Sequence, residues 1–375
     1  MTESTHSSPS ALALTPRPAT LADLDDLVRL ENTCFTADRL SRRSLRHFIT
    51  KSHSKFWVMG SPAVAYGLVL FHRGTSLARI YSLAVAPEAR GRGYARQLIE
   101  AMEASAIAEG ALFIRLEVAD DNLSALHLYQ SFGYEPIRRL TEYYEDGHDG
   151  IRMEKRLHIN PHKPRELCFY PQSTEFTCGP ASLLMAMRQS DSSTELNQAA
   201  ELNLWREATT IYMTTGHGGC SPHGLALALH KRGFVTQLRV SSEETPFLQS
   251  VRDPRKKQVV EGIHQDFLQQ IMAAGIPVST APLEVPELRQ LLEDGFMVVL
   301  LISTYQLNRN KAPHWIWLVH MDDKYAYIND PDVDEEEWQT ELDNIYVPVP
   351  LERFSKMMKY GKNQYRAAVL FHTQP

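Results

Sequence analysis

The sequence has few cysteines, no long apolar run and no excess of basic residues. Four cysteines in 375 residues are too few for a disulfide framework, so a reducing cytoplasm is the expected compartment. The longest apolar run, Phe296 to Ile302, is far shorter than the roughly 20 residues of a membrane-spanning helix. A formal net charge of -6 leaves no global basic surface for nucleic acid. We therefore expect a cytoplasmic protein with no membrane span and no nucleic-acid partner.

Length and composition predict two globular domains. A chain of 375 residues exceeds the usual size of one domain, and its 43% hydrophobic and 22% charged residues are ordinary for globular proteins. Residues 15–157 alternate β-rich runs with helical stretches, which predicts an α/β domain, whereas residues 167–375 predict an α+β domain. Residues 1–14 lack the segments of a secretory signal and are expected to be a flexible arm. The proline-containing residues 158–166 are expected to be a linker.

The hydrophobic patterns also predict individual helices and strands. Helices are expected over residues 94–109, 180–188 and 222–232, and strands over residues 57–59, 63–72, 78–85, 112–118, 297–303, 314–321 and 325–329. Two candidate functional sites follow, one at a strand-to-helix turn in the first region and one at a helix start in the second.

A glycine-containing turn forms the first candidate site. The preceding strand is expected to end at Val85, and Gly91 and Gly93 let backbone N–H groups approach a ligand without a Cβ in the way. The N-terminus of the following helix adds roughly half a positive charge, which suits a pyrophosphate. A tight turn that binds no ligand has the same glycines, so other residues must show whether this turn binds one.

The run from Arg90 to Ala95 resembles the CoA-pyrophosphate motif of the GNAT superfamily of N-acetyltransferases, Arg-x-x-Gly-x-Ala after a strand. The segment from Leu116 to Pro136 resembles the second signature of the branch that acetylates the N-termini of ribosomal proteins. The resemblance implies a GNAT fold, with a mixed central sheet and flanking helices, and acetyl-CoA as the cofactor. The residues expected to bind this cofactor are Leu83, Val85, Arg90, Gly91, Arg92, Gly93, Tyr94, Ala95 and Asn122.

The same resemblance implies the catalytic groups of the first site. Amide formation from a thioester needs a deprotonated amine and a proton for the leaving thiolate. In that branch a glutamate is the proposed general base and a tyrosine the general acid, which correspond to Glu117 and Tyr129 here. Taken singly, Glu117 could be a solvated strand end, Tyr129 a packed helix residue and Asn122 a helix N-cap. Residues 141–155 resemble the hairpin that closes the peptide groove, so the expected acceptor is a free amine of a peptide or protein.

A cysteine at a helix start marks the second candidate site. Cys178 precedes Gly179, Pro180 and an apolar run, and a thiol at a helix N-terminus is a better nucleophile because the helix dipole favours the thiolate. Such a thiolate needs an imidazole oriented by a third group. If residues 321–324 turn a hairpin, Asp330 comes to lie beside His314, which selects His314 over His320.

This second pattern resembles papain-like cysteine peptidases of the C39 group, in which a His-containing strand precedes an Asp-Pro pair. The resemblance implies a papain-like fold, with Gln172 as an oxyanion donor and Asp330 as the orienting carboxylate. Asp332 is a rival for the latter role. Singly, Cys178 could be a small buried hydrophobe and His314 a hydrogen-bonded strand histidine.

A metal site is the remaining reading of the second region. His217, Cys220 and His223 are spaced like zinc ligands, but no fourth ligand is evident, so no metal is expected. The segment from Cys220 to Leu229 is interpreted as a structural helix start.

Together these patterns predict a bifunctional peptide- or protein-modifying enzyme, an N-acetyltransferase joined to a cysteine peptidase. Two alternatives stay open for the second region. It could be a thiol-dependent acyl transferase or ligase, because an amine can replace water as the acceptor of an acyl-enzyme. It could also be a non-catalytic peptide-binding module. The sequence does not specify the oligomeric state.

Overall fold

The structure of the chain is a computed structural model. It describes residues 14–145, 147–157, 168–209, 218–251, 253–281, 283–308, 312–333 and 339–373. The chain divides into two compact units, one of residues 1–71 and 77–159 and the other of residues 72–76 and 160–375. The predicted arm, apart from Leu14, and the predicted linker lie outside the described residues.

The first unit is built on a seven-stranded sheet with the strand order β1-β2-β3-β4-β5-β7-β6. Strands β4 and β5 are parallel, and the other neighbouring pairs are antiparallel. The elements are β1 (Arg17–Pro18), η1 (Leu21–Asp23), α1 (Leu24–Cys34), α2 (Arg42–Thr50), β2 (Ser54–Gly60), β3 (Ala63–Phe71), β4 (Leu77–Val85), η2 (Pro87–Ala89), α3 (Tyr94–Ala108), β5 (Phe113–Ala119), α4 (Leu123–Ser131), β6 (Glu135–Leu140) and β7 (Gly150–Arg156).

Alternation along β5 separates an apolar face of this sheet from a charged one. Ile114, Leu116 and Val118 belong to one buried cluster with apolar residues of α3, whereas the intervening Arg115 and Glu117 point to the other face. Helix α3 packs closely on β3, because a Cβ at Gly67 would lie 2.9 Å from the Met102 sulfur. The charged face is therefore the side of the sheet on which polar chemistry can be placed.

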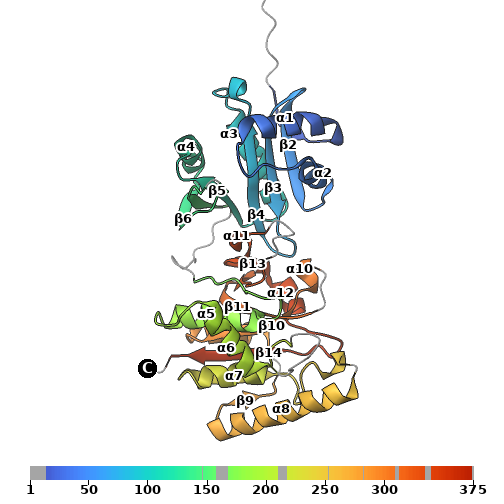
Figure 1. Ribbon diagram of the computed structural model, residues 1–375, viewed down its shortest axis with the longest axis vertical. Helices are drawn as coiled ribbons and strands as arrows, with labels where there is room; N and C mark the ends of the chain where they lie inside the picture. Colours follow the sequence, from blue (N-terminus) through green and yellow to red (C-terminus); the bar gives the residue numbers. More distant parts are fainter. Residues whose placement is uncertain are drawn as a thin grey trace, which may run out of the picture. The chain divides into compact units, whose positions relative to one another are not determined.

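The second unit contains another seven-stranded sheet, with the order β13-β12-β11-β10-β14-β8-β9. Figure 1 labels β13, β11, β10, β14 and β9 in this succession. Strands β8 and β9 are parallel, and the other neighbouring pairs are antiparallel. Its elements are α5 (Cys178–Ser190), α6 (Gln198–Ala208), α7 (Pro222–His230), β8 (Val235–Val240), η3 (Leu248–Ser250), α8 (Pro254–Ala274), β9 (Val278–Ser279), α9 (Val285–Glu293), β10 (Met297–Ser303), α10 (Tyr305–Asn308), β11 (Pro313–Met321), β12 (Tyr325–Asn329), α11 (Glu341–Asn344), β13 (Val347–Pro350), α12 (Leu351–Met357) and β14 (Ala367–His372).

Both faces of this second sheet are covered by apolar side chains. Val299 and Leu301 of β10 pack in one cluster with α5 and α7, whereas Val298 and Leu300 pack in another with α9 and α12. A strand buried on both faces has an apolar side chain at nearly every position, which explains the continuous apolar run of this segment.

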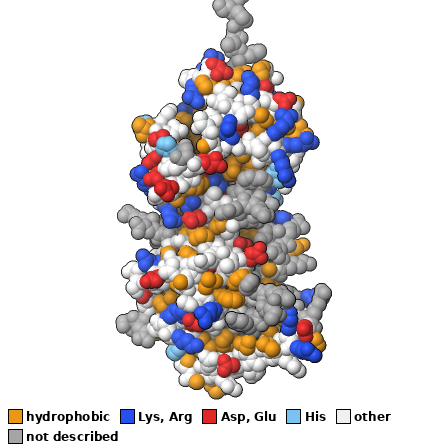
Figure 2. All heavy atoms as spheres, viewed as in Figure 1, with side chains coloured by type: hydrophobic (Ala, Val, Ile, Leu, Met, Phe, Trp, Pro, Cys, Tyr) orange, Lys and Arg blue, Asp and Glu red, His pale blue; other side chains and the backbone are white. Residues whose placement is uncertain are grey.

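The predicted α/β and α+β classes are confirmed. The predicted strands 297–303 and 325–329 have the bounds of β10 and β12, and the predicted helix 180–188 extends in α5 to Cys178 and Ser190. Within the part of the chain that the structure describes, no helix is both long and apolar enough to cross a bilayer. On the face seen in Figure 2, acidic and basic side chains are interspersed over each unit.

Candidate active sites

The first site begins where two parallel strands separate. Pairing between β4 and β5 joins Leu77–Arg79 to Phe113–Arg115, and β4 then continues to Val85 while paired with β3. The register of β4 against β3 is irregular between Ile80 and Ser82, and such a bulge bends a strand. Leu83 and Val85 lie beyond the last β4–β5 pair, as the cofactor hypothesis requires.

The turn after β4 fits a pyrophosphate. Gly91 and Gly93 have φ values of +75° and +78°, and a Cβ at either position would have no heavy atom within 4 Å. The positive φ favours glycine, and the open space leaves room for a ligand beside the backbone. Gly93 is the N-cap of α3, so the first-turn N–H groups of Tyr94 and Ala95 have no partner within the helix.

Two arginine side chains near this turn donate hydrogen bonds to backbone carbonyl oxygens. Arg90 Nε donates to the Val85 carbonyl oxygen at 3.3 Å, and Arg92 Nη2 donates to that of Glu88 at 3.3 Å. Both guanidinium groups are exposed and could also reach phosphate oxygens. Asn122 is the N-cap of α4, where its Oδ1 accepts from the Ala125 N–H at 3.1 Å. Its expected role in cofactor binding stays a prediction.

Glu117 is held between two arginines. Its Oε2 accepts from Arg79 Nε and Nη2 at 3.1 and 2.9 Å, and its Oε1 accepts from Arg152 Nε at 3.4 Å. All three side chains are at most 7% exposed. The Glu117 carboxylate is therefore part of a buried ion-pair cluster. Its expected role as general base stays a prediction.

Tyr129 is buried in the core between the sheet and α4. Burial raises the pKa of its hydroxyl above the usual range, so the phenol carries its proton at neutral pH, as a general acid must. A second tyrosine, Tyr144 in the β6–β7 hairpin, was not singled out from the sequence. Burial, with smaller contributions from Tyr143, Glu117, Asp38 and Tyr129, raises its pKa, which places Tyr144 near both candidate catalytic groups.

The second site lies at the start of α5. Cys178 is the first residue of that helix and is buried. His314 Nε2 lies 2.6 Å from Asp330 Oδ1, and the histidine also hydrogen-bonds Cys178. Burial lowers the pKa of His314, but Asp330 and Cys178 outweigh it and hold that pKa well above the usual range. The three side chains therefore form a connected Cys-His-Asp arrangement in which the imidazole favours its charged form.

The register hypothesis that paired His314 with Asp330 is confirmed. Trp317 of β11 pairs with Asn329 of β12, so Asp330 follows the strand end beside His314. His320 stacks on Tyr327, with ring centroids 5.6 Å apart. The pairing of β11 with β12 is irregular between Leu318 and His320.

Gln172 and Asp332 form a second connected pair at this site. Gln172 Nε2 donates to Asp332 Oδ1 at 2.8 Å, and the Gln172 N–H donates to the Pro331 carbonyl oxygen at 2.9 Å. The Asp332 N–H in turn donates to Asp330 Oδ1 at 3.0 Å. Asp332 therefore contacts the glutamine, whereas Asp330 contacts the histidine. The amide of Gln172 keeps one N–H for another acceptor.

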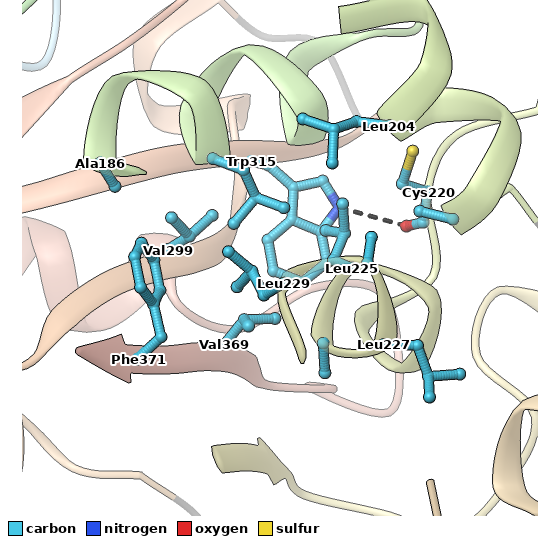
Figure 3. Packing of buried hydrophobic residues seen from close by; sticks show 14 of the residues in the cluster. Ala186, Leu204, Cys220, Leu225, Leu227, Leu229, Val299, Trp315, Val369 and Phe371 are labelled. Atoms are coloured by element: carbon cyan, nitrogen blue, oxygen red, sulfur yellow. Dashed lines mark hydrogen bonds between the residues drawn. The ribbon is translucent and has the colours of Figure 1, made fainter. Parts of the chain in front are cut away.

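The strand that carries His314 is fixed by a buried tryptophan. Trp315 is 2% exposed, and its Nε1 donates to the Cys220 carbonyl oxygen at 3.2 Å (Figure 3). The same picture shows Trp315 in one cluster with Leu225, Leu229 and Val369. The backbone carbonyl group of Cys220 thus holds the Trp315 indole in the core.

The possible zinc pattern is only partly described. His217 lies outside the described residues, and His223 is in α7, where Ser221 caps the helix by accepting from its N–H. In the described ranges, no group of three or more His, Cys, Asp or Glu side chains could hold a metal ion. The segment from Cys220 to Leu229 leads into α7 as interpreted from the sequence.

The first unit thus has an open glycine turn beside separated strands, and the second has a buried Cys-His-Asp arrangement. Residues 167–372 match the Peptidase_C39 like family, and because this match covers more than half of the chain, the protein belongs to that family. Residues 23–157 match the Acetyltransferase (GNAT) domain. The cofactor of such a domain is acetyl-CoA, and the open glycine turn and splayed strands described above fit it.

Curated relatives match the first unit. The catalytic subunit naa20 of the N-terminal acetyltransferase B complex of Schizosaccharomyces pombe is 31% identical over 110 residues, which are 28% of this chain and 58% of the relative. An N-alpha-acetyltransferase of Saccharolobus solfataricus is 27% identical over 155 residues, 38% of this chain and 93% of the relative. The chain thus spans little more than half of the first relative.

Solved structures also match this unit. The ribosomal-protein-S18-alanine N-acetyltransferase of Escherichia coli is 20% identical with a TM-score of 0.36, covering 40% of this chain and 98% of that structure. Ard1 of Thermoplasma volcanium is 22% identical with a TM-score of 0.37, covering 40% of this chain and all of that structure.

Proposed function

We propose that the chain is a bifunctional peptide-modifying enzyme, in which the first unit acetylates an amine and the second cleaves a peptide bond through a thiol. The observation that carries the second activity is the connected contact of Cys178, His314 and Asp330. A GNAT-domain match and an open cofactor turn support the first. The acceptor is a free amine on a peptide or protein, in line with the printed names of the relatives.

In the first unit, acetyl-CoA supplies the acetyl group as a thioester. Backbone N–H groups of the first turn of α3 would bind its pyrophosphate, and the part of β4 near Leu83 and Val85 would polarise the thioester carbonyl. Tyr129 donates its proton to the leaving thiolate. Tyr144, which interacts electrostatically with Glu117 and Tyr129, helps to position the amine.

In the second unit, the Cys178 thiolate attacks the carbonyl carbon of the scissile bond. The second N–H of the Gln172 amide and the backbone N–H of Cys178 stabilise the oxyanion that forms. Protonated His314 gives its proton to the leaving amine, which departs as the new N-terminus. His314 then accepts a proton from a water molecule whose oxygen attacks the thioester, so that the carboxylic acid leaves and the Cys178 thiolate beside protonated His314 is restored.

One experiment tests both activities. The wild type, Cys178→Ala and Tyr129→Phe are incubated with acetyl-CoA and a library of peptides that have free N-termini, and the products are identified by mass spectrometry. We expect Cys178→Ala to lose the cleaved products and Tyr129→Phe to lose most acetylated ones. If Cys178→Ala kept every wild-type product, the peptidase proposal would be wrong. Products longer than the substrates would indicate a ligase, and binding without any product would indicate a peptide-binding module.

A further inference from the structure

A buried carboxyl group in the first unit stands at the end of a chain of two short hydrogen bonds. Glu31, on α1, is 2% exposed, and its Oε1 accepts from Tyr66 Oη at 2.6 Å. Tyr66, on β3, is fully buried, and its Oη lies 2.8 Å from Ser82 Oγ on β4. The carboxyl group of Glu31 and the hydroxyl groups of Tyr66 and Ser82, on three different elements, therefore form one continuous hydrogen-bonded chain.

The inner end of this chain is suited to exchange a proton near neutral pH. Burial raises the pKa of Glu31 to about 7, although the hydrogen bond from Tyr66 and the charge of Arg39 act to lower it. The other titratable group that interacts with Glu31 is Cys34, at the end of the same helix. Burial and the Glu31 charge raise the pKa of Tyr66 well above its usual range, so Tyr66 can pass a proton without staying ionised.

The outer end of this hydrogen-bonded chain is Ser82, which lies where β4 separates from β5. Ser82 is partly exposed, follows the register irregularity of β4, and precedes Leu83 in the stretch beyond the last β4–β5 pair. This is the stretch where the thioester carbonyl is expected. Glu117, by comparison, has both oxygens bound by guanidinium groups.

We propose that Glu31 is the terminal proton acceptor for acetyl transfer, reached from the acceptor amine through the hydroxyls of Ser82 and Tyr66. This proposal rests on the acetyltransferase function proposed above. As the amine nitrogen bonds to the acetyl carbon, its proton passes to Ser82 Oγ, the Ser82 proton passes to Tyr66 Oη, and the Tyr66 proton passes to Glu31 Oε1. The C–S bond breaks, and the thiolate takes its proton from Tyr129. Glu31 afterwards releases its proton to water, and Tyr129 regains a proton from water. Ser82 contacts the substrate, and Tyr66 and Glu31 act through it.

The test measures release of CoA thiol from acetyl-CoA in the full chain, with a mixture of synthetic peptides that have free N-terminal amines. Glu31→Gln keeps an oxygen that can accept from Tyr66 but cannot take a proton, and we expect kcat to fall about 100-fold. The wild-type rate should rise with pH around 7, and this rise should be absent in Glu31→Gln. Ser82→Ala should lower kcat by a similar factor, and Ser82→Thr should have a kcat close to that of the wild type. The double variant of Ser82→Ala and Glu31→Gln should lose no more kcat than either single variant.

Glu109→Gln is the matched control, because Glu109 is an exposed carboxyl at the end of α3. An unchanged rate and pH profile in Glu31→Gln, with the wild type active, would overturn the relay and leave the acetyltransferase proposal standing. A wild type that releases no thiol from any peptide would overturn both. Infrared spectra provide a measurement that needs no acceptor: a protonated-carboxyl band that titrates near pH 7 should vanish in Glu31→Gln and persist in Glu109→Gln. A missing band in the wild type would also contradict the relay.

Discussion

His314 experiences two opposing effects within one buried site. Removal from water favours the neutral imidazole, whereas the Asp330 carboxylate 2.6 Å away and the neighbouring Cys178 favour the imidazolium. The raised pKa of His314 shows that the second effect is larger. An imidazolium beside a thiol stabilises the thiolate, which is the reactive form.

The reactivity of Cys178 should therefore depend on His314. We expect iodoacetamide to label Cys178 at pH 6.5, well below the value of about 8.5 at which an isolated thiol becomes reactive. His314→Ala should slow this labelling strongly at pH 6.5 and much less at pH 9. Mass spectrometry of the Cys178 peptide gives the rate, and the peptide of Cys34 provides an internal reference. Equal labelling of both variants at pH 6.5 would mean that His314 does not activate the thiol.

Asp332 acts on the same site through Gln172. Its Oδ1 accepts from Gln172 Nε2 at 2.8 Å, which fixes the direction of the remaining amide N–H. Removing an oxyanion donor costs about 100-fold in kcat, which we expect for Gln172→Ala. Asp332→Ala should lower kcat by less and leave KM nearly unchanged, and Asp332→Asn, which keeps an oxygen acceptor, should restore most of the loss. A peptidase assay in which Asp332→Ala has wild-type kcat would contradict this role.

Glu31 should also affect stability in a pH-dependent way. A carboxyl whose pKa is about 7 when folded and about 4.5 when unfolded stabilises the fold below pH 4.5, and this contribution is lost as pH rises towards 7. Glu31→Gln removes the titrating group. We therefore expect the difference in Tm, variant minus wild type, to be more positive at pH 8 than at pH 4.5. Calorimetry at both values checks this, and a difference that does not change with pH would indicate an ordinary pKa for Glu31.

At the scale of elements, helix α7 is fitted tightly against the end of α6. A Cβ at Gly224 would lie 2.5 Å from the Ala208 carbonyl oxygen, and backbone cannot move aside as a flexible side chain can. We expect Gly224→Ala to lower the free energy of unfolding of the second unit by about 1–3 kcal/mol, the usual range for overpacking. Gly233→Ala in the following turn is a useful comparison, because it meets open space but has a φ of +87°. Denaturant unfolding measures both variants.

Helices α7 and α8 also bury two histidines against each other. The His223 and His264 rings are 4.7 Å apart, and burial together with His264 lowers the pKa of His223 to about 3. Because the unfolded chain binds a proton at His223 near pH 6.5 and the folded chain does not, stability should fall as pH drops from 6.5 towards 3. His264→Phe should reduce this acid sensitivity. Equal loss of Tm between pH 7 and pH 4 in both proteins would contradict the expectation.

The elements also show which contacts a sequence can predict. Asp330 could be placed beside His314 because a short hairpin turn fixes which residues of two adjacent strands are paired. The pairing of Gln172 with Asp332 joins residues 160 positions apart and depends on how a loop packs on the sheet. Likewise, Glu31 meets Tyr66 only once α1 lies on β3, and no local pattern of α1 distinguishes this carboxylate from an ordinary buried one. The role given to Glu117 came from a resemblance, which carried no information about the two arginines bound to it.

At the scale of the whole molecule, each unit has its own sheet, core and candidate catalytic groups. Neither set of proposed groups borrows a side chain from the other unit, because Glu31, Tyr66, Ser82 and Tyr129 belong to the first and Cys178, His314, Asp330 and Gln172 to the second. The two chemical steps should therefore be separable by mutation.

The final prediction concerns a substrate shared by the two units. Peptide cleavage releases an amine as the new N-terminus, and an amine is the proposed acceptor of the first unit. If the two steps act on one peptide, the wild type should yield C-terminal fragments that are acetylated at the cleavage point. Cys178→Ala should yield none of these while still acetylating peptides with free N-termini, and Tyr129→Phe should yield the same fragments unacetylated. An equal mixture of the two variants tests whether the cleaved fragment stays on one protein molecule between the two steps. A wild-type yield of acetylated fragments means that the fragment is released to solution before acetylation. A lower yield, with each step at its wild-type rate, means that the fragment is retained.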